Sequence, residues 1–317
     1  MTPPIEPAKN TKAVQLPGYP AAYTTDAHRP DVFDPALKHY PHAFIKGPPS
    51  AGDEAQALAL TAARTRLQDR SLHALARSPV RDLIVLRGST TLEAWFPGRA
   101  RRAHDIDLVV RNAEWDPDCP AAGALLSEIR RVVSDALVAE EVQVLDDEIK
   151  IDGIWTYERA EGRRLSVPWV YAGSMREVIQ IDIVFREPLQ DAPALESLRD
   201  HASPPGYREP PTGPSLWFAS RAESLAWKLL WLDTDMHPQA KDLYDAVLLA
   251  EHVALPIELV RRVFAAKADP WKHGLDTQFI RAWEVEWASF ALEYPELATD
   301  DRDAWIGRLA STLQLTA

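Results

Sequence analysis

Residues 83–110, LIVLRGSTTLEAWFPGRARRAHDIDLVV, decide how the amino-terminal half of the chain is expected to fold. The apolar run Leu83–Leu86 predicts a short buried strand, and Gly88-Ser89 ends it before a helical pattern resumes. A basic loop follows the helix, and Asp105–Val110 predicts a second strand. The stretch therefore predicts a strand, a tight turn, a short helix and another strand that begins with acidic residues.

Two carboxylates share one face of the second predicted strand. Alternate side chains of an extended chain point the same way, so Asp105 and Asp107 project together. Like charges at that spacing repel each other, and the arrangement favours a divalent cation with hard oxygen ligands, Mg²⁺ or Mn²⁺. A third acid, Asp182, lies in the apolar strand predicted over residues 180–184, where an unpaired carboxylate would be costly. These three acids are the predicted catalytic and metal-binding residues.

Gly88 and Ser89 are suited to hold a phosphate group. Glycine lets the backbone approach a ligand closely, and the helix start that follows offers free N–H groups. Three carboxylates holding two metal ions would then serve in-line phosphoryl transfer. Each motif alone is common, because D-x-D pairs occur as surface carboxylates and Gly-Ser as a simple helix cap. Their order along the chain favours a functional site.

The wider pattern predicts an α/β (α+β) core that contains a mixed sheet. A helical bundle is expected to follow this core at the carboxy terminus. Helical spacing is seen over residues 53–76 and 121–141, and residues 142–185 have the alternation of β-structure. A proline-rich segment then separates two regions of different composition. We predict an extended or disordered arm over 1–50, a catalytic domain over 51–202, a linker over 203–214 and a helical domain over 215–317.

Composition limits the class of protein. Cys119 is the only cysteine, the amino terminus lacks a secretory signal pattern, and no apolar run approaches the roughly 20 residues of a membrane helix. We therefore expect a cytoplasmic protein. The net charge of −12 argues against bulk binding of nucleic acid, yet nine arginines stand against three acids over residues 61–102. Three arginines of that segment are the expected contacts to RNA or phosphate: Arg99, Arg101 and Arg102.

A second group of charged residues lies beyond the linker. Lys228 occurs in the strongly apolar segment Glu223–Leu230, so its amine must reach solvent or meet an anion. Lys241 and Asp245 are four residues apart on a predicted helix, beside Asp242, and could form an ordinary i,i+4 ion pair. The functional interpretation is that Lys228 meets a triphosphate while Lys241, Asp242 and Asp245 form the other wall of a nucleotide cleft.

Taken together, these motifs resemble those of a known enzyme superfamily. The segment from Gly88-Ser89 to Asp105-x-Asp107, with Asp182, resembles the active-site signature of the polymerase-β-like nucleotidyltransferase superfamily. With Lys228 and Lys241-Asp242-Leu243-Tyr244-Asp245 added, residues 80–250 resemble the AbiEii/AbiGii (MenT-like) toxin family. Many members have Gly-Gly-Thr-Ala-Leu where this chain has Gly-Ser-Thr-Thr-Leu, and Ser or Thr where it has Ala103.

The resemblance implies an enzyme that transfers a nucleoside monophosphate from an NTP to an RNA acceptor, in some members the 3′ end of tRNA, under control of a cognate antitoxin. It implies that Ser89 binds phosphate, Asp105 and Asp107 the metals, Lys228 the triphosphate and Asp242 the nucleotide. Two alternatives remain at this stage: transfer to a small molecule, and binding of a nucleotide or partner without turnover.

Overall fold

The computed structural model describes residues 54–139, 141–156, 160–173, 175–198, 213–235, 238–266, 280–285 and 287–316, together with four short strands nearer the amino terminus. These strands form two hairpins: β1 (Ala13–Val14) pairs with β2 (Tyr23–Thr24), and β3 (Asp31–Phe33) with β4 (Phe44–Lys46). The rest of the expected arm and most of the expected linker lie outside the described residues.

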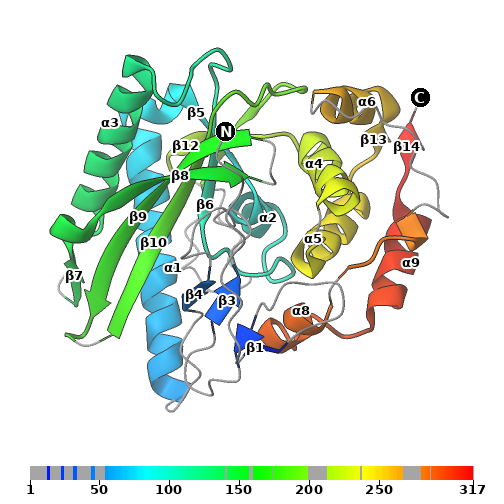
Figure 1. Ribbon diagram of the computed structural model, residues 1–317, viewed down its shortest axis with the longest axis horizontal. Coiled ribbons are helices and arrows are strands. Elements are labelled where there is room, and N and C mark those ends of the chain that lie inside the picture. Colours follow the sequence, from blue (N-terminus) through cyan, green and yellow to red (C-terminus); the bar gives the residue numbers. More distant parts are fainter. Residues whose placement is uncertain are drawn as a thin grey trace.

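The central feature is a mixed eight-stranded sheet (Figure 1). Its order is β11-β12-β5-β6-β10-β9-β7, and β8 pairs with β9 beside β7. The β10–β6 and β12–β5 pairs are parallel, and the other pairs of this sheet are antiparallel. The strands are β5 (Ile84–Arg87), β6 (Ile106–Val110), β7 (Val142–Val144), β8 (Lys150–Thr156), β9 (Ala160–Tyr171), β10 (Met175–Val184), β11 (Ala194–Ser197) and β12 (Ser215–Phe218). The predicted mixed α/β core is therefore confirmed.

One face of the sheet is covered by α1 (Glu54–Arg77) and α3 (Pro120–Ala136), which run side by side in Figure 1. Both helices have apolar residues at helical spacing, so each has one face to bury. Leu75 on α1 and Ile129 on α3 are fully buried, in one core with Ile84 and Leu108 of the sheet. Residues of even number on β5 and β6 point to this side, as strand geometry requires.

The opposite face carries the carboxy-terminal helices. Val85 and Val109, whose numbers are odd, belong to a second core with the helices. The helices are α4 (Arg221–Thr234), α5 (Ala240–Ala250), α6 (Ile257–Ala265), α8 (Ala288–Glu293) and α9 (Arg302–Thr312), with the short pair β13 (Leu255–Pro256) and β14 (Leu315–Thr316). The helical bundle therefore packs against the sheet itself.

One expectation needs correction. The residues directly after the predicted linker were expected to be helical, but Ser215–Phe218 forms β12 and pairs in parallel with β5. Leu216 and Phe218 alternate with more exposed neighbours, and both are fully buried. The helices begin only at Arg221, where the Ser220 hydroxyl accepts a hydrogen bond from the Glu223 N–H at 3.0 Å. The division of the chain into separate domains stays a prediction.

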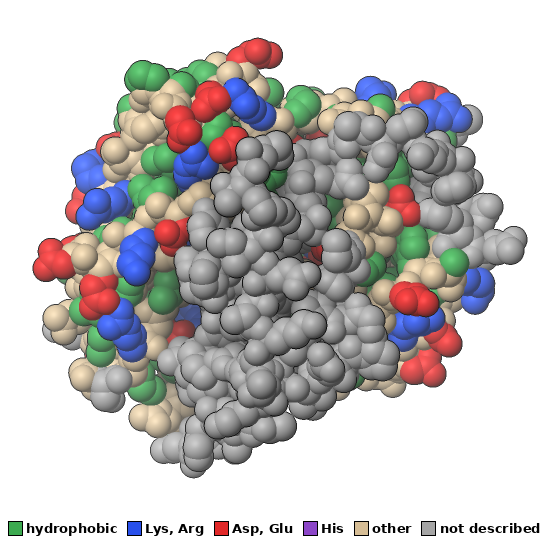
Figure 2. Space-filling model, viewed as in Figure 1, with side chains coloured by type: hydrophobic (Ala, Val, Ile, Leu, Met, Phe, Trp, Pro, Cys, Tyr) green, Lys and Arg blue, Asp and Glu red, His purple; other side chains and the backbone are tan. Residues whose placement is uncertain are grey.

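The surface carries charges of both signs. On the described part of the face in Figure 2, basic and acidic side chains are interspersed along the margins. The described part of this face therefore shows no continuous basic surface. In the described parts of the chain, no helix has both the length and the apolar character needed to cross a membrane.

Candidate active site

Three aspartates converge at the middle of the sheet. One carboxylate oxygen from each of Asp105, Asp107 and Asp182 lies within 4.8 Å of the other two. Asp107 on β6 is paired in register with Asp182 on β10, and Asp105 lies in the bend directly before β6. The structure thus brings together residues that are 75 positions apart in the sequence, counted from Asp107 to Asp182.

The carboxylate of Asp107 is in an environment that disfavours its charge. Desolvation, followed by the neighbouring charge of Asp105, raises its pKa from 3.8 to about 7, and Asp182 adds to the effect. Arg87 and Lys228 act in the opposite direction. A cation bound between these oxygens would relieve the repulsion, so the site favours a positively charged ligand.

Gly88 lies against the same carboxylate. It connects β5 to α2 (Ser89–Trp95) with φ of 75°, a conformation that residues with side chains rarely adopt. A Cβ added here would collide with Oδ2 of Asp107. Ser89, the first residue of α2, is buried beside this contact. Glycine is therefore required both by the backbone conformation and by the approach of Asp107.

Asp182 has a partner that sequence reasoning missed. Arg164 on β9 stands opposite Asp182 in the strand register. Its Nε donates to Oδ1 and its Nη2 to Oδ2, both at 2.7 Å, and both side chains are buried. Asp182 therefore has an arginine partner within the protein as well as its place in the group of three carboxylates, and its role as a metal ligand stays a prediction. Local sequence gives no sign of the pairing, because it depends on strand register.

Arg87 is a second residue that sequence reasoning missed. It is the last residue of β5, stands opposite Asp107 in register and is 1% exposed. Its Nη1 donates to Oε2 of Glu187 at 2.7 Å, and its guanidinium carbon lies 5.1 Å from the ring centroid of Trp227. A guanidinium over an indole face is a favourable cation–π contact. A charged residue ending an apolar strand next to Gly88 was the available signal.

Lys228 does meet anions, but they belong to the protein. Its Nζ lies 2.7 Å from Oδ1 of Asp242 and 2.9 Å from Oδ2 of Asp245, and all three side chains are buried. Burial lowers the pKa of Lys228, but Asp242 and then Asp245 outweigh burial and raise it above its ordinary value. The lysine is therefore held in its charged form. Asp245 is bound by Lys228 and Arg101, whereas the sequence suggested Lys241, which is half-buried at the start of α5.

The three arginines expected to contact RNA or phosphate have different surroundings. Arg101 is buried, and its Nε and Nη2 donate to the two oxygens of Asp245 at 3.2 and 3.0 Å. It therefore differs from the expectation of a surface contact, because an acid of α5 already engages its guanidinium. Arg99 is half exposed and pairs with Glu251, and exposed Arg102 donates to the Thr65 hydroxyl at 3.3 Å.

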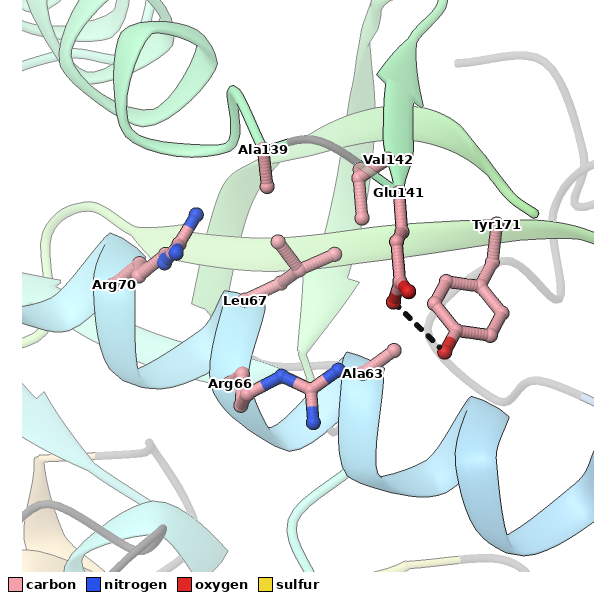
Figure 3. Close-up of a pocket in the computed structure, with 8 residues that line it drawn as sticks. All are labelled: Ala63, Arg66, Leu67, Arg70, Ala139, Glu141, Val142 and Tyr171. Carbon is pink, nitrogen blue, oxygen red and sulfur yellow. Dashed lines mark hydrogen bonds between the residues drawn. The ribbon is translucent and has the colours of Figure 1, made fainter. Parts of the chain in front are cut away.

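A separate pocket of about 350 Å³ lies between α1 and the ends of β7 and β9 (Figure 3). Arg66 and Arg70 border it on α1, and across from them the Tyr171 hydroxyl donates to Glu141 at 3.1 Å. None of the three aspartates lines this pocket. We therefore place the candidate active site at the carboxylate group.

Comparison with known proteins agrees with this geometry. Residues 70–308 match the family model described as "Nucleotidyl transferase AbiEii toxin, Type IV TA system". A search of curated proteins finds no match. Among solved structures, the fold is similar to MenT4, the nucleotidyltransferase toxin Rv2826c from Mycobacterium tuberculosis H37Rv. That comparison has a TM-score of 0.51 and 18% identity, and covers 81% of this chain and 82% of the other.

Substitution of Gly88 tests the contact with Asp107. Gly98 has nearly the same backbone angle, φ of 76°, but nothing lies within 4 Å of a Cβ added there. Gly98→Ala should cost only the backbone strain, about 1–2 kcal/mol. Gly88→Ala should lower the free energy of unfolding further, because it adds the collision with Asp107. Urea denaturation of both variants measures the difference, and equal losses would contradict the close contact.

Substitution of Arg101 tests the buried charge cluster. Arg101→Met leaves Asp245 with one cation fewer in a buried site, and should lower the free energy of unfolding by about 3–5 kcal/mol. Arg131→Met is the matched control, since Arg131 pairs with Glu128 and Asp135 on the exposed face of α3. It should leave the free energy of unfolding nearly unchanged, because exposed ion pairs contribute little to stability. Similar losses for the two variants would show that the Arg101–Asp245 pair is not buried in solution.

The raised pKa of Asp107 predicts a pH effect in metal-free protein. Folding strengthens proton binding at Asp107, so this group's contribution to stability is lost as pH rises from 3.8 to about 7. Asp107→Asn cannot ionise and escapes this loss. With EDTA present, the variant should therefore gain stability relative to the natural chain between about pH 5 and about pH 8. A stability difference that is the same at both pH values would contradict the assignment.

Proposed function

The chain belongs to the AbiEii family of nucleotidyltransferase toxins from type IV toxin–antitoxin systems, and on that premise we propose that it uses Mg²⁺ or Mn²⁺ to move a nucleoside monophosphate from an NTP to RNA. The proposed acceptor is the 3′ end of tRNA. The proposed location is the cytoplasm, where both substrates occur, and the proposed regulator is a cognate antitoxin protein.

The observation that carries the proposal is the group formed by Asp105, Asp107 and Asp182 beside Gly88. Its donor atoms are all carboxylate oxygens, the ligands that Mg²⁺ and Mn²⁺ prefer. The pKa of Asp107 is raised by burial and then by the neighbouring charge of Asp105, and a divalent cation would balance that charge. The residues present therefore fit a metal site. A divalent ion bound there would lower the pKa of the attacking hydroxyl and neutralise charge on the transferring phosphate.

The protein groups have separate proposed roles. Asp105 and Asp107 are metal ligands, and Asp182 completes the acidic group. Gly88 and Ser89 receive the phosphates, because glycine lets a ligand approach the backbone closely and no described side chain caps the start of α2. This role is supported by their position beside Asp107.

The nucleotide is proposed to enter between Gly88 and the helices α4 and α5. Lys228 is held charged by Asp242 and Asp245, and we propose that it exchanges one of these carboxylates for a triphosphate oxygen when NTP binds. Lys241, Asp242 and Asp245 form the opposite wall. Arg87, which stands opposite Asp107 in the strand register, and Lys228 both lie over the ring of Trp231, so this cluster is near the metal ligands.

The acceptor RNA is proposed to approach over the loop between α2 and β6. Arg99 and Arg102 have exposed guanidinium groups on this loop, which leads directly into Asp105. Arginine suits phosphate because its planar donors match phosphate oxygens. Arg101 has a different proposed role: it secures the loop to α5 through Asp245.

A labelling experiment tests this proposal. Purified protein is incubated with Mg²⁺, one α-labelled NTP at a time, and either bulk tRNA or a mixture of small hydroxylated molecules. We expect label on the 3′ end of tRNA. Asp105→Asn and Asp107→Asn should each reduce transfer by about 10³-fold or more, since each removes charge that stabilises the transition state. Asp147→Asn, at an exposed acid of the segment before β8, is the control and should retain activity.

The other outcomes have definite meanings. Label confined to a small molecule would replace the RNA acceptor with an antibiotic-modifying type of reaction. NTP binding without transfer to either acceptor would indicate a binding protein. Full activity of folded Asp107→Asn would refute the catalytic assignment.

A further inference from the structure

Arg164 is placed where a second cation would otherwise be expected. Both of its hydrogen bonds to Asp182 measure 2.7 Å, and the two side chains are only 5% and 6% exposed. An arginine that grips both oxygens of a carboxylate fixes its position and its orientation. Asp182 is therefore held by the protein before any ligand binds.

The sheet brings this pair to the metal ligands. Asp182 on β10 stands between Asp107 on β6 and Arg164 on β9. Side chains directly opposite on neighbouring strands share a face and lie about 5 Å apart at their Cβ atoms. The backbone positions of the row Asp107–Asp182–Arg164 are thus set by hydrogen bonding between three strands.

The charges in this row point to a particular number of metal ions. Three carboxylates carry three negative charges, and the guanidinium of Arg164 offsets one, which leaves the charge of a single divalent ion. The other cations that act on Asp107 already have acidic partners: Arg87 binds Glu187, and Lys228 binds Asp242 and Asp245. Two divalent ions in the nucleotide-free protein would therefore exceed the available negative charge.

We propose that Arg164 is a positioning residue that engages both oxygens of Asp182 and offsets its charge, so that the nucleotide-free protein binds one divalent ion, with Asp105 and Asp107 as its direct ligands. The guanidinium supplies the second positive charge beside that ion. This inference rests on the proposed function, because it concerns the metal site of the same reaction. It replaces the expectation of two metal ions shared equally by three carboxylates.

Counting bound Mn²⁺ tests the inference without measuring catalysis. The full-length protein is titrated with Mn²⁺ in the absence of nucleotide, and free Mn²⁺ is followed by electron paramagnetic resonance. We expect one tightly bound ion per chain. Arg164→Met removes the cation and should allow a second ion to bind, whereas Arg164→Lys keeps the charge and should retain one. Circular dichroism checks that each variant is folded.

The Mn²⁺ affinities of two aspartate variants provide a second test. This test remains valid even if the Arg164→Met variant does not fold. Asp182→Asn should still bind one ion, with affinity lowered by about 10-fold to 100-fold at most, the range found when outer partners of a metal site are replaced. Asp107→Asn removes a direct ligand and should weaken binding by more than about 100-fold. Equal losses for the two variants, or two ions of similar affinity in the natural chain, would overturn the inference.

The test separates this inference from the proposed function. A protein that labels tRNA yet binds two Mn²⁺ ions contradicts only the role of Arg164. A protein that binds a single ion through Asp105 and Asp107 yet labels no acceptor contradicts only the proposed transfer reaction.

Discussion

The hydrogen-bonded register of β5, β6, β10 and β9 is the constraint on which the candidate active site depends. It aligns Arg87, Asp107, Asp182 and Arg164 in one row across the sheet. Two like charges stand next to each other at the centre of the row, and a cation flanks them on each side. Backbone hydrogen bonds hold the acids close despite their repulsion, because moving one would break the pairing of its whole strand.

The carboxy-terminal helices, which pack on the face of the sheet that carries this row, add a second constraint. Lys228 and Arg101 share the carboxylate of Asp245, and Asp242 completes this buried cluster. Buried ion pairs give little net stability compared with apolar packing, but their geometry must be satisfied once the charges are inside. The cluster therefore fixes how the loop before β6 is attached to α5. Because that loop ends at Asp105, the position of the acidic group depends on both layers.

Much of the fold could be predicted from local patterns in the sequence. Apolar runs of strand length, helical spacing and the breaks at glycine and proline identified the mixed α/β core and the helices around it. The motifs from Gly88 to Asp107, with Lys228 and Lys241-Asp242, indicated the toxin family that the family match then confirmed. These predictions succeeded because strand and helix periodicity, and the spacing of residues within one motif, are properties of short segments.

The sequence by itself thus determined the reaction class and the acidic residues proposed to carry it. Only the tertiary structure decided how those residues are held. Arg164 is paired with Asp182, Arg101 is buried against Asp245 rather than facing RNA, and Ser215–Phe218 joins the sheet rather than a helix. Each outcome depends on which distant strand or helix lies opposite a residue. That choice is made by strand register and by packing between layers, which local periodicity does not encode.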